Sequence, residues 1–472
     1  MYRVIDELPW REPVEAFAPF ADEPFALLLD WAQTGWSFIA VRPFSTLTMK
    51  GDELLRDGAA TELRPFDALR AFYAGNCPAQ DALFAEGVRL PFMGGVGGYL
   101  GYDLGASLER LPPPRPPFAV DDQHLPGLAL GAYDFLLAFD AARRRVFVIA
   151  RPGAEKKAMA AFAPSRAQLP PVSTSPVRPQ TELSSNFSPA AYRDAVARVI
   201  DYIHAGDIFQ ANLSQRFEAR LAPGDDAFML YRRLTAQAPA PHAAFFNFGE
   251  GTLVSNSPER FLQCRDGLVE TRPIKGTRPR GRDAAEDAAL AAELLASEKD
   301  RAENTMIVDL LRNDLSKVCK DFSVKVEKLN ALESFATVHH LVSTVTGVLQ
   351  DGMTAIDLMA ACFPGGSITG APKVRAMEII AELEPTLRGP YCGAIGYIGA
   401  DGAMDSAIAI RTMVVREGRA SFQAGGGIVA DSDPFREYEE TLVKARAMMV
   451  ALGFAAPAHE EPALQGRKGR PR

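Results

Sequence analysis

The chain has 472 residues, of which 47% are hydrophobic and 23% are charged, and its formal net charge is −8 at pH 7. This composition is typical of a globular protein with a large core, and it argues against general nucleic-acid binding because the basic residues cluster only locally. The sequence contains no run of about 18 apolar residues, so it predicts no membrane-spanning helix. Its five cysteines include no C-x-x-C pair, which favours a reduced, cytoplasmic setting without a zinc site.

The N-terminal third is expected to contain strands. The stretch FLLAFDAARRRVFVIA, residues 135–150, has two apolar runs separated by a charged turn, which predicts a β-hairpin. Residues 164–187 are rich in Pro and Ser and predict an exposed connection. We therefore divide the chain into an N-terminal part (1–163), this connection, a main region (188–454) and a polar tail (455–472) that we expect to be disordered.

The main region opens with a helix signal. Ser188 and Pro189 suit a helix cap and a first turn. Apolar residues then recur at helical spacing, at Tyr192, Val196, Val199, Ile200 and Ile203.

Basic side chains are concentrated in RPIKGTRPRG, residues 272–281. Lys275 stands between Ile274 and Gly276, where a side chain is expected to be held rather than free in water. A solvated basic turn is the alternative if the stretch is considered alone.

Two predicted helices each carry a pair of carboxylates on one face. Asp300 and Glu303 are three residues apart within 297–318, and Glu437 and Glu440 repeat this spacing within 431–449. Such pairs are common on solvated helices. Together they could bind Mg²⁺, which takes a few carboxylate oxygens and completes its coordination with water and substrate. Spacing alone does not show that the two pairs converge.

Two glycine-rich segments follow the same region. FPGGSITGAPKVRAMEII, residues 363–380, lacks the P-loop pattern and predicts a loop leading into a helix near Pro372, whose start and Thr369 would suit an anion. FQAGGGIVADS, residues 422–432, predicts a strand running into Gly425, Gly426 and Gly427. Close approach to a ligand or a tight bulge would explain three glycines there.

These segments together carry a family resemblance. PIKGTRPRG, DRAENTMIVDLLRNDL, HHLVSTVTG, FPGGSITGAPKVRAMEII, IRTMVV and AGGGIVADS, in this order, resemble the chorismate-utilising enzymes over about residues 190–450. Residues 1–185 match only loosely, as the variable N-terminal part of the amino-transferring members. The resemblance implies an α/β fold of the α+β type, with one large domain of antiparallel sheets flanked by helices, and an enzyme that needs Mg²⁺ and acts on chorismate.

The resemblance also assigns roles at the site. Arg411, Lys444 and the amides of Gly425–Gly427 would hold one carboxylate of chorismate, and Mg²⁺ on Glu303 and Glu440 would hold the other. Asp300 and Glu437 would hold water around the metal. Glu259, in SNSPERF, matches the general acid that protonates the leaving hydroxyl. The substrate pocket would be lined by Thr277, His340, Thr369 and Tyr391, although His340 could instead be a hydrogen-bonded structural residue.

Two positions separate the branches of the family. Members that add water carry a lysine base where this chain has Gln210, so Gln210 favours ammonia as the nucleophile. Members that place nitrogen at C2 of chorismate typically have alanine where this chain has Lys275, whereas those that place it at C4 have lysine. A neutral Lys275 would attack C2 and let ammonia enter at C4, and burial near Mg²⁺, Arg272 and Arg278 would lower its pKa. Amination at C2 is the main alternative, and water addition is a weaker one.

The expected partners follow from what the sequence contains. No glutaminase nucleophile motif is present, so ammonia is expected from a separate glutamine amidotransferase subunit. Relatives that bind tryptophan often have a serine-rich signature. The corresponding stretch here, ALLLDWAQTGW, departs from it at Asp30–Trp31, so the sequence does not predict tryptophan binding. A non-catalytic paralogue is disfavoured because the carboxylates and Lys275 are all present.

Overall fold

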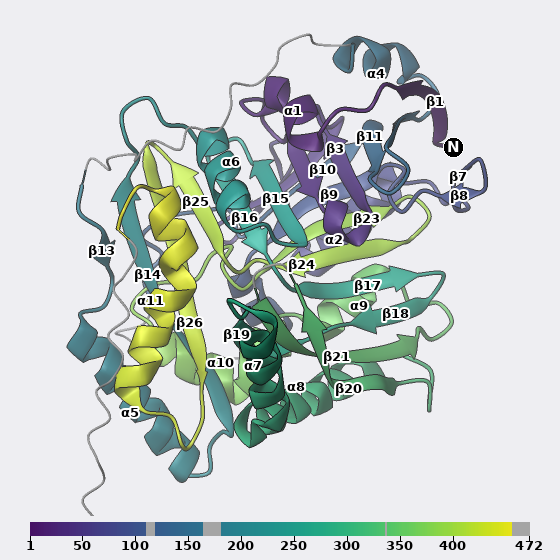
Figure 1. The fold of residues 1–472 in the computed structure, drawn as a ribbon. Helices are drawn as coiled ribbons and strands as arrows, with labels where there is room; N and C mark the ends of the chain where they lie inside the picture. The colour runs from purple at the N-terminus through teal and green to yellow at the C-terminus, as the bar shows by residue number, and fades with distance from the viewer. Residues whose placement is uncertain (110–118, 164–180, 336–337, 456–472) are drawn as a thin grey trace, which may run out of the picture.

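The computed structural model describes residues 1–109, 119–163, 181–335 and 338–455. They form two large sheets of 12 strands each and a small hairpin, β7 (Phe84–Ala85) and β8 (Val88–Arg89). The strands of both large sheets pair in antiparallel fashion, and helices flank them (Figure 1). This confirms the predicted fold class.

The first sheet joins strands from both ends of the chain. Its spatial order is β1 (Arg3–Leu8), β12 (Arg145–Ala150), β11 (Phe135–Asp140), β3 (Trp36–Ala40), β2 (Leu27–Asp30), β15 (His242–Asn247), β16 (Thr252–Ser257), β25 (Thr412–Arg416), β26 (Arg419–Ile428), β14 (Gln210–Arg220) and β13 (Ser184–Ser185), with β22 (Gly370–Ala371) also paired to β14. Strand β2 from the N-terminal part pairs directly with β15.

The second sheet is interleaved in the same way. Its order is β19 (Ile274–Pro279), β21 (Val338–Val348), β18 (Leu268–Thr271), β17 (Arg260–Arg265), β24 (Met404–Ile408), β23 (Ala394–Gly399), β9 (Gly95–Leu100), β10 (Leu128–Tyr133), β4 (Ser45–Lys50), β5 (Glu53–Arg56) and β6 (Ala59–Thr61), with β20 (Lys325–Ser334) paired to β21. Strand β9 lies between its sequence neighbour β10 and the distant β23.

The helices cover these sheets from several sides. They are α1 (Pro13–Phe17), α2 (Pro65–Asn76), α3 (Gly105–Leu108), α4 (Glu155–Ala161), α5 (Pro189–His204), α6 (Ala227–Gln237), α7 (Ala284–Ala296), α8 (Glu298–Ser316), α9 (Ala355–Cys362), α10 (Lys373–Leu383) and α11 (Pro434–Ala451), with short 3-10 turns η1 (Ala18–Phe20), η2 (Ala32–Thr34), η3 (Tyr102–Leu104) and η4 (Gly366–Ile368). Helix α11 packs on β26 and beside α5, and α7 and α8 pack on β19 and β21 (Figure 1).

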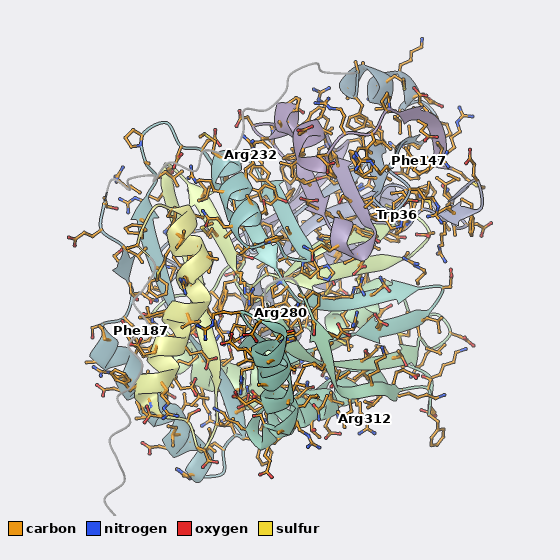
Figure 2. The ribbon with its side chains drawn as sticks, viewed as in Figure 1. Trp36, Phe147, Phe187, Arg232, Arg280 and Arg312 are labelled. Atoms are coloured by element: carbon orange, nitrogen blue, oxygen red, sulfur yellow. The ribbon has the colours of Figure 1, made fainter. Side chains whose placement is uncertain are left out.

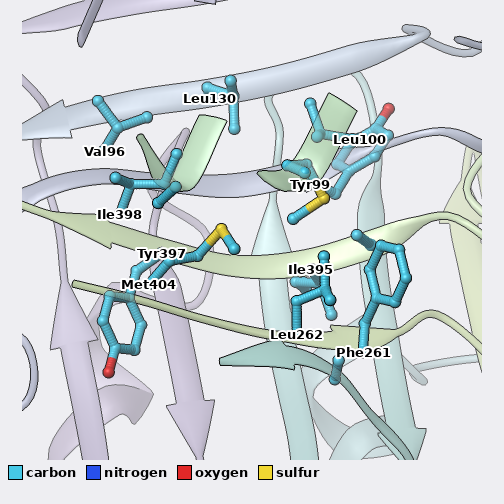
Figure 3. Packing of buried hydrophobic residues seen from close by; sticks show 14 of the residues in the cluster. Val96, Tyr99, Leu100, Leu130, Phe261, Leu262, Ile395, Tyr397, Ile398 and Met404 are labelled. Atoms are coloured by element: carbon cyan, nitrogen blue, oxygen red, sulfur yellow. The ribbon is translucent and has the colours of Figure 1, made fainter. Parts of the chain in front are cut away.

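The main core lies where the two sheets face each other. The ring of Phe38 in β3 packs edge-on against Tyr397 in β23, with centroids 5.6 Å apart, and Tyr99 of β9 meets Phe246 of β15 at 6.2 Å. Figure 3 shows the apolar side chains of β9 and β23 packed at this core. At the N-terminal end of the first sheet, Trp36 stacks near Phe147 (Figure 2). Burying this many apolar and aromatic groups is the main source of stability.

The elements predicted from periodicity and caps are confirmed. Strands β11 and β12 form the expected hairpin, and α5 begins after Ser188, whose hydroxyl accepts from the amide of Ala191. Helices α8 and α11 carry the two carboxylate pairs, and α10 follows Pro372. Strand β26 continues through the three glycines paired to β14 without a register shift, so the bulge interpretation is wrong.

Several boundary predictions remain predictions. Most of the 164–187 connection and the 456–472 part of the tail lie outside the described residues, and Ser184–Ser185 form the short strand β13. Both large sheets contain strands from each side of that connection. Within the described ranges, none of the helices combines the length and apolar character needed to cross a membrane.

Candidate active site

The lysine of the basic stretch lies on β19, at the edge of the second sheet. The register of β19 against β21 shifts between Lys275 and Thr277, and Gly276 fills this irregularity with a φ of +74°. The ammonium nitrogen of Lys275 donates to the backbone carbonyl of Ser367 at 3.1 Å. The side chain is therefore held, as predicted, rather than solvated as a basic turn.

Several groups change the pKa of Lys275. Burial lowers the pKa of this lysine below its usual value, and the positive charge of Lys444 acts in the same direction. The carboxylates of Glu303, Glu259 and Glu440 oppose these effects, but the net direction is downward. A lowered pKa makes the neutral, nucleophilic amine more accessible.

Glu259 follows strand β16 and is buried. Its Oε1 accepts a hydrogen bond from the hydroxyl of Ser367 at 2.8 Å. Burial raises the pKa of Glu259, against the opposing effects of the Ser367 hydrogen bond and the charges of Lys275 and Lys444. A buried carboxyl that keeps its proton suits a general acid.

Arg411 lies beside Glu259, and its positive charge could bind an anionic ligand. It adopts a positive φ of +49°, and burial lowers the pKa of its guanidinium while Glu259 opposes this. In the part of the chain that the structure describes, its side chain has no hydrogen bond or ion pair. An arginine held in this state suits a ligand carboxylate, which it can bind through two parallel hydrogen bonds.

His340 and Thr277 contact each other across β19 and β21. The Thr277 hydroxyl and His340 Nδ1 are 2.9 Å apart. Burial lowers the pKa of His340 to about 4, and the charge of Arg411 adds to this, so the imidazole is neutral at neutral pH. His340 is thus hydrogen-bonded, as the structural interpretation expects, and its place in the substrate pocket stays a prediction.

Two further predicted pocket residues are buried. The hydroxyl of Thr369 donates to Gly365 O at 2.7 Å, within its own loop. The guanidinium of Arg388 lies 5.7 Å from the centroid of the Tyr391 ring. Burial raises the pKa of the Tyr391 phenol, so it remains a neutral group.

Gln210 is the first residue of β14 and is completely buried. Neither its amide nitrogen nor its amide oxygen has a hydrogen-bond partner among the described residues. A Cβ added at Gly427 would lie 2.0 Å from Gln210 Nε2, so the amide takes up space that only glycine leaves open in this arrangement. A buried amide without partners is costly, which indicates a ligand that would satisfy it.

The glycine run of β26 faces the N-terminal half of α11. Lys444 donates to Gly425 O at 2.9 Å and pairs with Glu440 at 2.7 Å. A Cβ at Gly426 would lie 3.0 Å from Glu437 Oε2. The glycines therefore allow the strand to approach the charged side chains of α11 closely.

Carboxylates of α8 and α11 approach each other across Lys299. Lys299 lies between them, 3.8 Å from Glu303 Oε1 and 4.0 Å from Glu437 Oε1. Burial raises the pKa of Glu303 and Glu437, whereas the adjacent Lys444 lowers that of Glu440. One member of each pair, Glu303 and Glu437, thus approaches the same lysine, and the convergence of all four carboxylates on a metal stays a prediction.

The carboxylates of α8 and α11 are the groups that could hold Mg²⁺. Among the described residues, no group of three or more His, Cys, Asp or Glu side chains is arranged to hold a metal. Mg²⁺ commonly takes only one or two protein carboxylates. Oε1 of Glu303 is buried without a hydrogen-bond partner, and a hard cation would satisfy it. Glu303 and Glu440 therefore fit Mg²⁺, and the metal site remains a prediction.

The arginines of the basic stretch have a role other than the predicted one. Arg272 pairs with Glu333, and Arg278 bonds Glu293 at 2.9 Å and Asp300 at 3.3 Å. Burial lowers the pKa of Lys275, as predicted, but the nearest basic group that adds to this is Lys444, and Arg272 and Arg278 are not among the largest influences on it.

Arg278 and Arg280 hold the neighbouring helices, whereas Glu333, the partner of Arg272, lies on strand β20. Arg278 ties β19 to α7 and α8, and Arg280, labelled beside α7 in Figure 2, bonds Asp287 of α7 at 2.7 Å. Asp300 consequently has an arginine partner, so only part of its charge remains for water around a metal.

Two residues at the site were not predicted. Ser367 contacts both Glu259 and Lys275, and Lys299 lies between the carboxylate pairs. Ser367 carries no signal in sequence, because a serine in a glycine-rich loop is ordinary. Lys299 could have been noticed four residues before Glu303, at the spacing of a helical ion pair.

The chain matches a known family over most of its length. The model of chorismate binding enzymes matches residues 24–450. Aminodeoxychorismate synthase component 1 of Klebsiella aerogenes is 42% identical over 455 residues, covering 94% of this chain and 98% of the relative. Anthranilate synthase component 1 of Thermus thermophilus is also 42% identical, over 456 residues, covering 94% and 96%.

Solved structures share the fold. Anthranilate synthase component I from Streptococcus pneumoniae superposes with a TM-score of 0.77 at 34% identity, covering 88% of this chain and 92% of that chain. The menaquinone-specific isochorismate synthase from Escherichia coli superposes at 0.71 with 17% identity, covering 96% and 95%, and shows the fold alone. The family match, the relatives and the site geometry agree, and the chain belongs to the chorismate binding enzymes.

Proposed function

We propose that this chain catalyses the amination of chorismate at C4, giving 4-amino-4-deoxychorismate, with ammonia as the nitrogen donor. The observation that carries the proposal is Lys275, whose amine is held at Ser367 O beside the buried acid Glu259. The aminodeoxychorismate synthase relatives are consistent with it. The product would enter 4-aminobenzoate and folate biosynthesis in the cytoplasm.

The site would bind chorismate through its two carboxylates. Arg411, which has no partner for its guanidinium among the described side chains, and Lys444 would bind one carboxylate of chorismate, with the β26 glycine amides nearby. The other carboxylate would lie towards Glu303 and Glu440, which would hold Mg²⁺. The bound ion would act as a Lewis acid that draws electron density from the ring.

Side chains of this chain would form the covalent bond to the substrate and transfer the protons. The neutral Lys275 amine adds to C2, the ring double bonds shift, and the C4–O bond breaks. Glu259 gives its proton to the departing hydroxyl, which leaves as water. Ammonia then adds at C4, the double bonds shift back, and the C2–N bond breaks to release Lys275 as a neutral amine. The new C4 ammonium returns one proton to Glu259.

The surroundings suit this sequence of steps. Burial lowers the pKa of Lys275 and raises that of Glu259, so a neutral amine and a protonated acid can coexist. The unpartnered amide of Gln210 can hydrogen-bond an incoming ammonia but cannot deprotonate water. We infer that the ammonia comes from a separate glutamine amidotransferase subunit, in keeping with the component 1 names of the relatives.

Amination at C2 is the second candidate. Anthranilate synthase relatives are as similar in sequence as the C4-aminating ones, which supports keeping it. It needs no lysine nucleophile, so it leaves the held position of Lys275 without a purpose.

The two functions are separated by Lys275→Ala. With ammonium and Mg²⁺, the wild type should give the C4 product, and mass spectrometry without ammonia should detect a chorismate adduct on the Lys275 peptide. The variant should lose about 10²-fold in rate, form no adduct and shift towards the C2 product, because ammonia can then attack C2 directly. Lys320→Ala, which removes an exposed lysine paired with Asp351, is the control. C4 product from Lys275→Ala at a near wild-type rate would refute the proposal.

A further inference from the structure

One residue contacts both groups that the proposed reaction uses. Ser367 lies in η4, and its hydroxyl donates to Glu259 Oε1 at 2.8 Å while its backbone carbonyl accepts from Lys275 Nζ at 3.1 Å. Ser367 is only 8% exposed. The acid lies just after β16 and the nucleophile lies on β19, and Ser367 contacts both through its own atoms. The backbone of Ile274, next to Lys275, also hydrogen-bonds Glu259.

We infer that Ser367 is a positioning residue that fixes the placement and the protonation of Glu259 relative to Lys275. This inference rests on the roles proposed above for those two groups. The carbonyl directs the lysine amine, and the hydroxyl orients one oxygen of the carboxyl group. Because both contacts come from a single residue, a shift of Ser367 would displace both groups.

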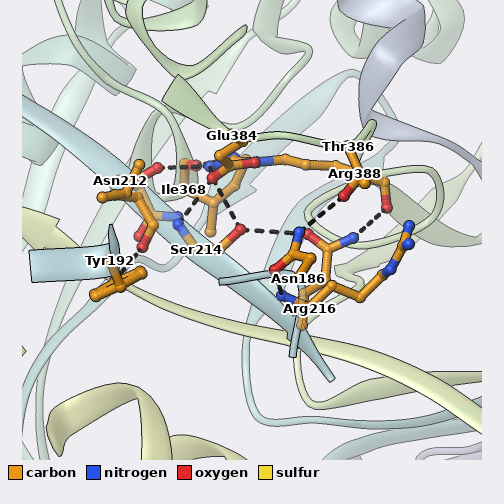
Figure 4. A network of polar contacts seen from close by, with 11 residues as sticks. Asn186, Tyr192, Asn212, Ser214, Arg216, Ile368, Glu384, Thr386 and Arg388 are labelled. Carbon is orange, nitrogen blue, oxygen red and sulfur yellow. Dashed lines mark hydrogen bonds and ion pairs between the residues drawn. The ribbon is translucent and has the colours of Figure 1, made fainter. Parts of the chain in front are cut away.

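The loop that carries Ser367 is held from behind by a buried arginine. Arg388 donates to Ile368 O at 3.1 Å and also to Asn212 O, and it makes a two-bond ion pair with Glu384 (Figure 4). Glu384 in turn accepts from the amide and hydroxyl of Ser214 on β14. The backbone beside Ser367 is therefore tied to a strand and to the end of α10.

Two aromatic rings also pack against this arginine. Its guanidinium lies 4.5 Å from the centroid of Tyr102 and 5.7 Å from that of Tyr391. A buried guanidinium that makes four hydrogen bonds leaves the 366–368 turn little freedom. Small errors in the placement of reacting groups are costly to rate, so a rigid turn at this point serves catalysis.

The hydroxyl also biases the proton of Glu259. Its hydrogen bond favours the ionised form, as do the charges of Lys275 and Lys444, whereas burial favours the protonated form and dominates. Arg411 faces the same carboxyl. Removing the hydroxyl should therefore raise the pKa of Glu259 further, because one group that stabilises the anion is lost.

The test is Ser367→Ala, followed by chorismate consumption as a function of pH with saturating ammonium and Mg²⁺. We expect kcat to fall about 10- to 100-fold with KM for chorismate within about twofold, since the carboxylate-binding groups are untouched. The alkaline limb of kcat that reports the acid should move to higher pH. Ser367→Thr, which keeps a hydroxyl, should restore both the rate and the limb.

A matched control separates this effect from simple loss of packing. Ser255→Ala removes another buried serine hydroxyl, bonded at 2.8 Å to Thr412 Oγ1 rather than to a reacting group. It should leave the pH profile unchanged. If Ser367→Ala is insoluble, Ser367→Cys, with a much weaker donor, carries the same expectation.

The outcome can be read independently of the proposed function. Consumption of chorismate is followed whichever product forms, and the product is identified separately by chromatography. A C2 product with a shifted limb would overturn the proposed function and support the role of Ser367. An unchanged limb in Ser367→Ala, or a loss confined to KM, would overturn the inference about Ser367.

Discussion

Lys299 of α8 and Glu437 of α11 bring two separate helices together, with the lysine nitrogen 4.0 Å from Glu437 Oε1. The same nitrogen is 3.8 Å from Glu303 Oε1 on its own helix. One ammonium group thus lies between the carboxylate pairs that are predicted to bind Mg²⁺. Lys299 therefore neutralises part of the negative charge of these carboxylates. A bound divalent cation would neutralise that charge in its place.

Replacing Lys299 with Met should strengthen Mg²⁺ binding. The lysine side chain is 55% exposed, so its effect on the carboxylates is partly screened and should be modest. We expect about a two- to fivefold tighter dissociation constant for Mg²⁺ alone, measured by calorimetry without substrate. Lys299→Arg keeps the charge and should bind as the wild type does. Weaker binding by the Met variant would show that Lys299 supports the site rather than competes with the metal.

The predicted metal ligands can be tested by isosteric changes. Glu303→Gln or Glu440→Gln should lower turnover by at least about 10²-fold and weaken Mg²⁺ binding in calorimetry, because each removes an anionic oxygen. Circular dichroism should show an unchanged fold. Glu439→Gln, on α11 next to Glu440, is the control and should behave as wild type. Full activity of either ligand variant at low Mg²⁺ would contradict the assignment.

The nitrogen source is a separate prediction. The sequence contains no glutaminase nucleophile motif, so the pure chain should consume chorismate with ammonium chloride and not with glutamine. Product formation is measured with each donor at the same pH. Adding a glutamine amidotransferase subunit should confer glutamine dependence. Glutamine-dependent turnover by the single chain would mean that it contains an amidotransferase activity.

His340 should contribute to loss of stability in acid. Its pKa is about 4 in the folded protein against about 6.5 when unfolded, so between these values the unfolded state binds more protons. Stability due to His340 is present above pH 6.5 and is lost as pH falls to about 4. The full effect is on the order of 3 kcal/mol. His340→Gln should lose less stability than the wild type in urea unfolding between pH 7 and 4, and equal losses would refute this.

Arg388 is predicted to matter more for stability than any exposed arginine. Its side chain is 1% exposed, and Arg388→Met would leave Glu384 buried without its cation. The expected cost is about 3–5 kcal/mol in the free energy of unfolding. Arg198→Met breaks the exposed pair between Arg198 on α5 and Glu382 on α10 and should cost less than about 1 kcal/mol. Similar costs for both variants, measured by urea unfolding, would contradict the buried-pair account.

The features that sequence predicts well are those with local causes. The cap at Ser188, the i,i+3 carboxylates of α8 and α11, and the 135–150 hairpin depend on residues close together in the chain. They could be derived from periodicity and turn chemistry alone. Their assembly could not, because the meeting of Glu303 with α11 depends on side chains more than a hundred positions apart.

Two contacts of the site could not be predicted from the sequence, for different reasons. Arg278 was expected to act on Lys275, yet its fork geometry is used by Glu293 and Asp300 on α7 and α8. Proximity in sequence gives no information on which of several nearby carboxylates a flexible arginine selects. Ser367 was missed for the opposite reason, because its two contacts come from segments about 90 and 110 residues away.

The pairing of β9 with β23 has a consequence for synthesis of the protein. Strand β9 ends at Leu100 and β23 begins at Ala394, so the ribosome adds roughly 290 residues between the two. At about 5–20 residues per second this takes roughly 15–60 s. During that time an apolar strand edge of β9 has no partner, so it is open to wrong pairing. Chaperone dependence of the nascent chain should therefore peak before residue 400 emerges.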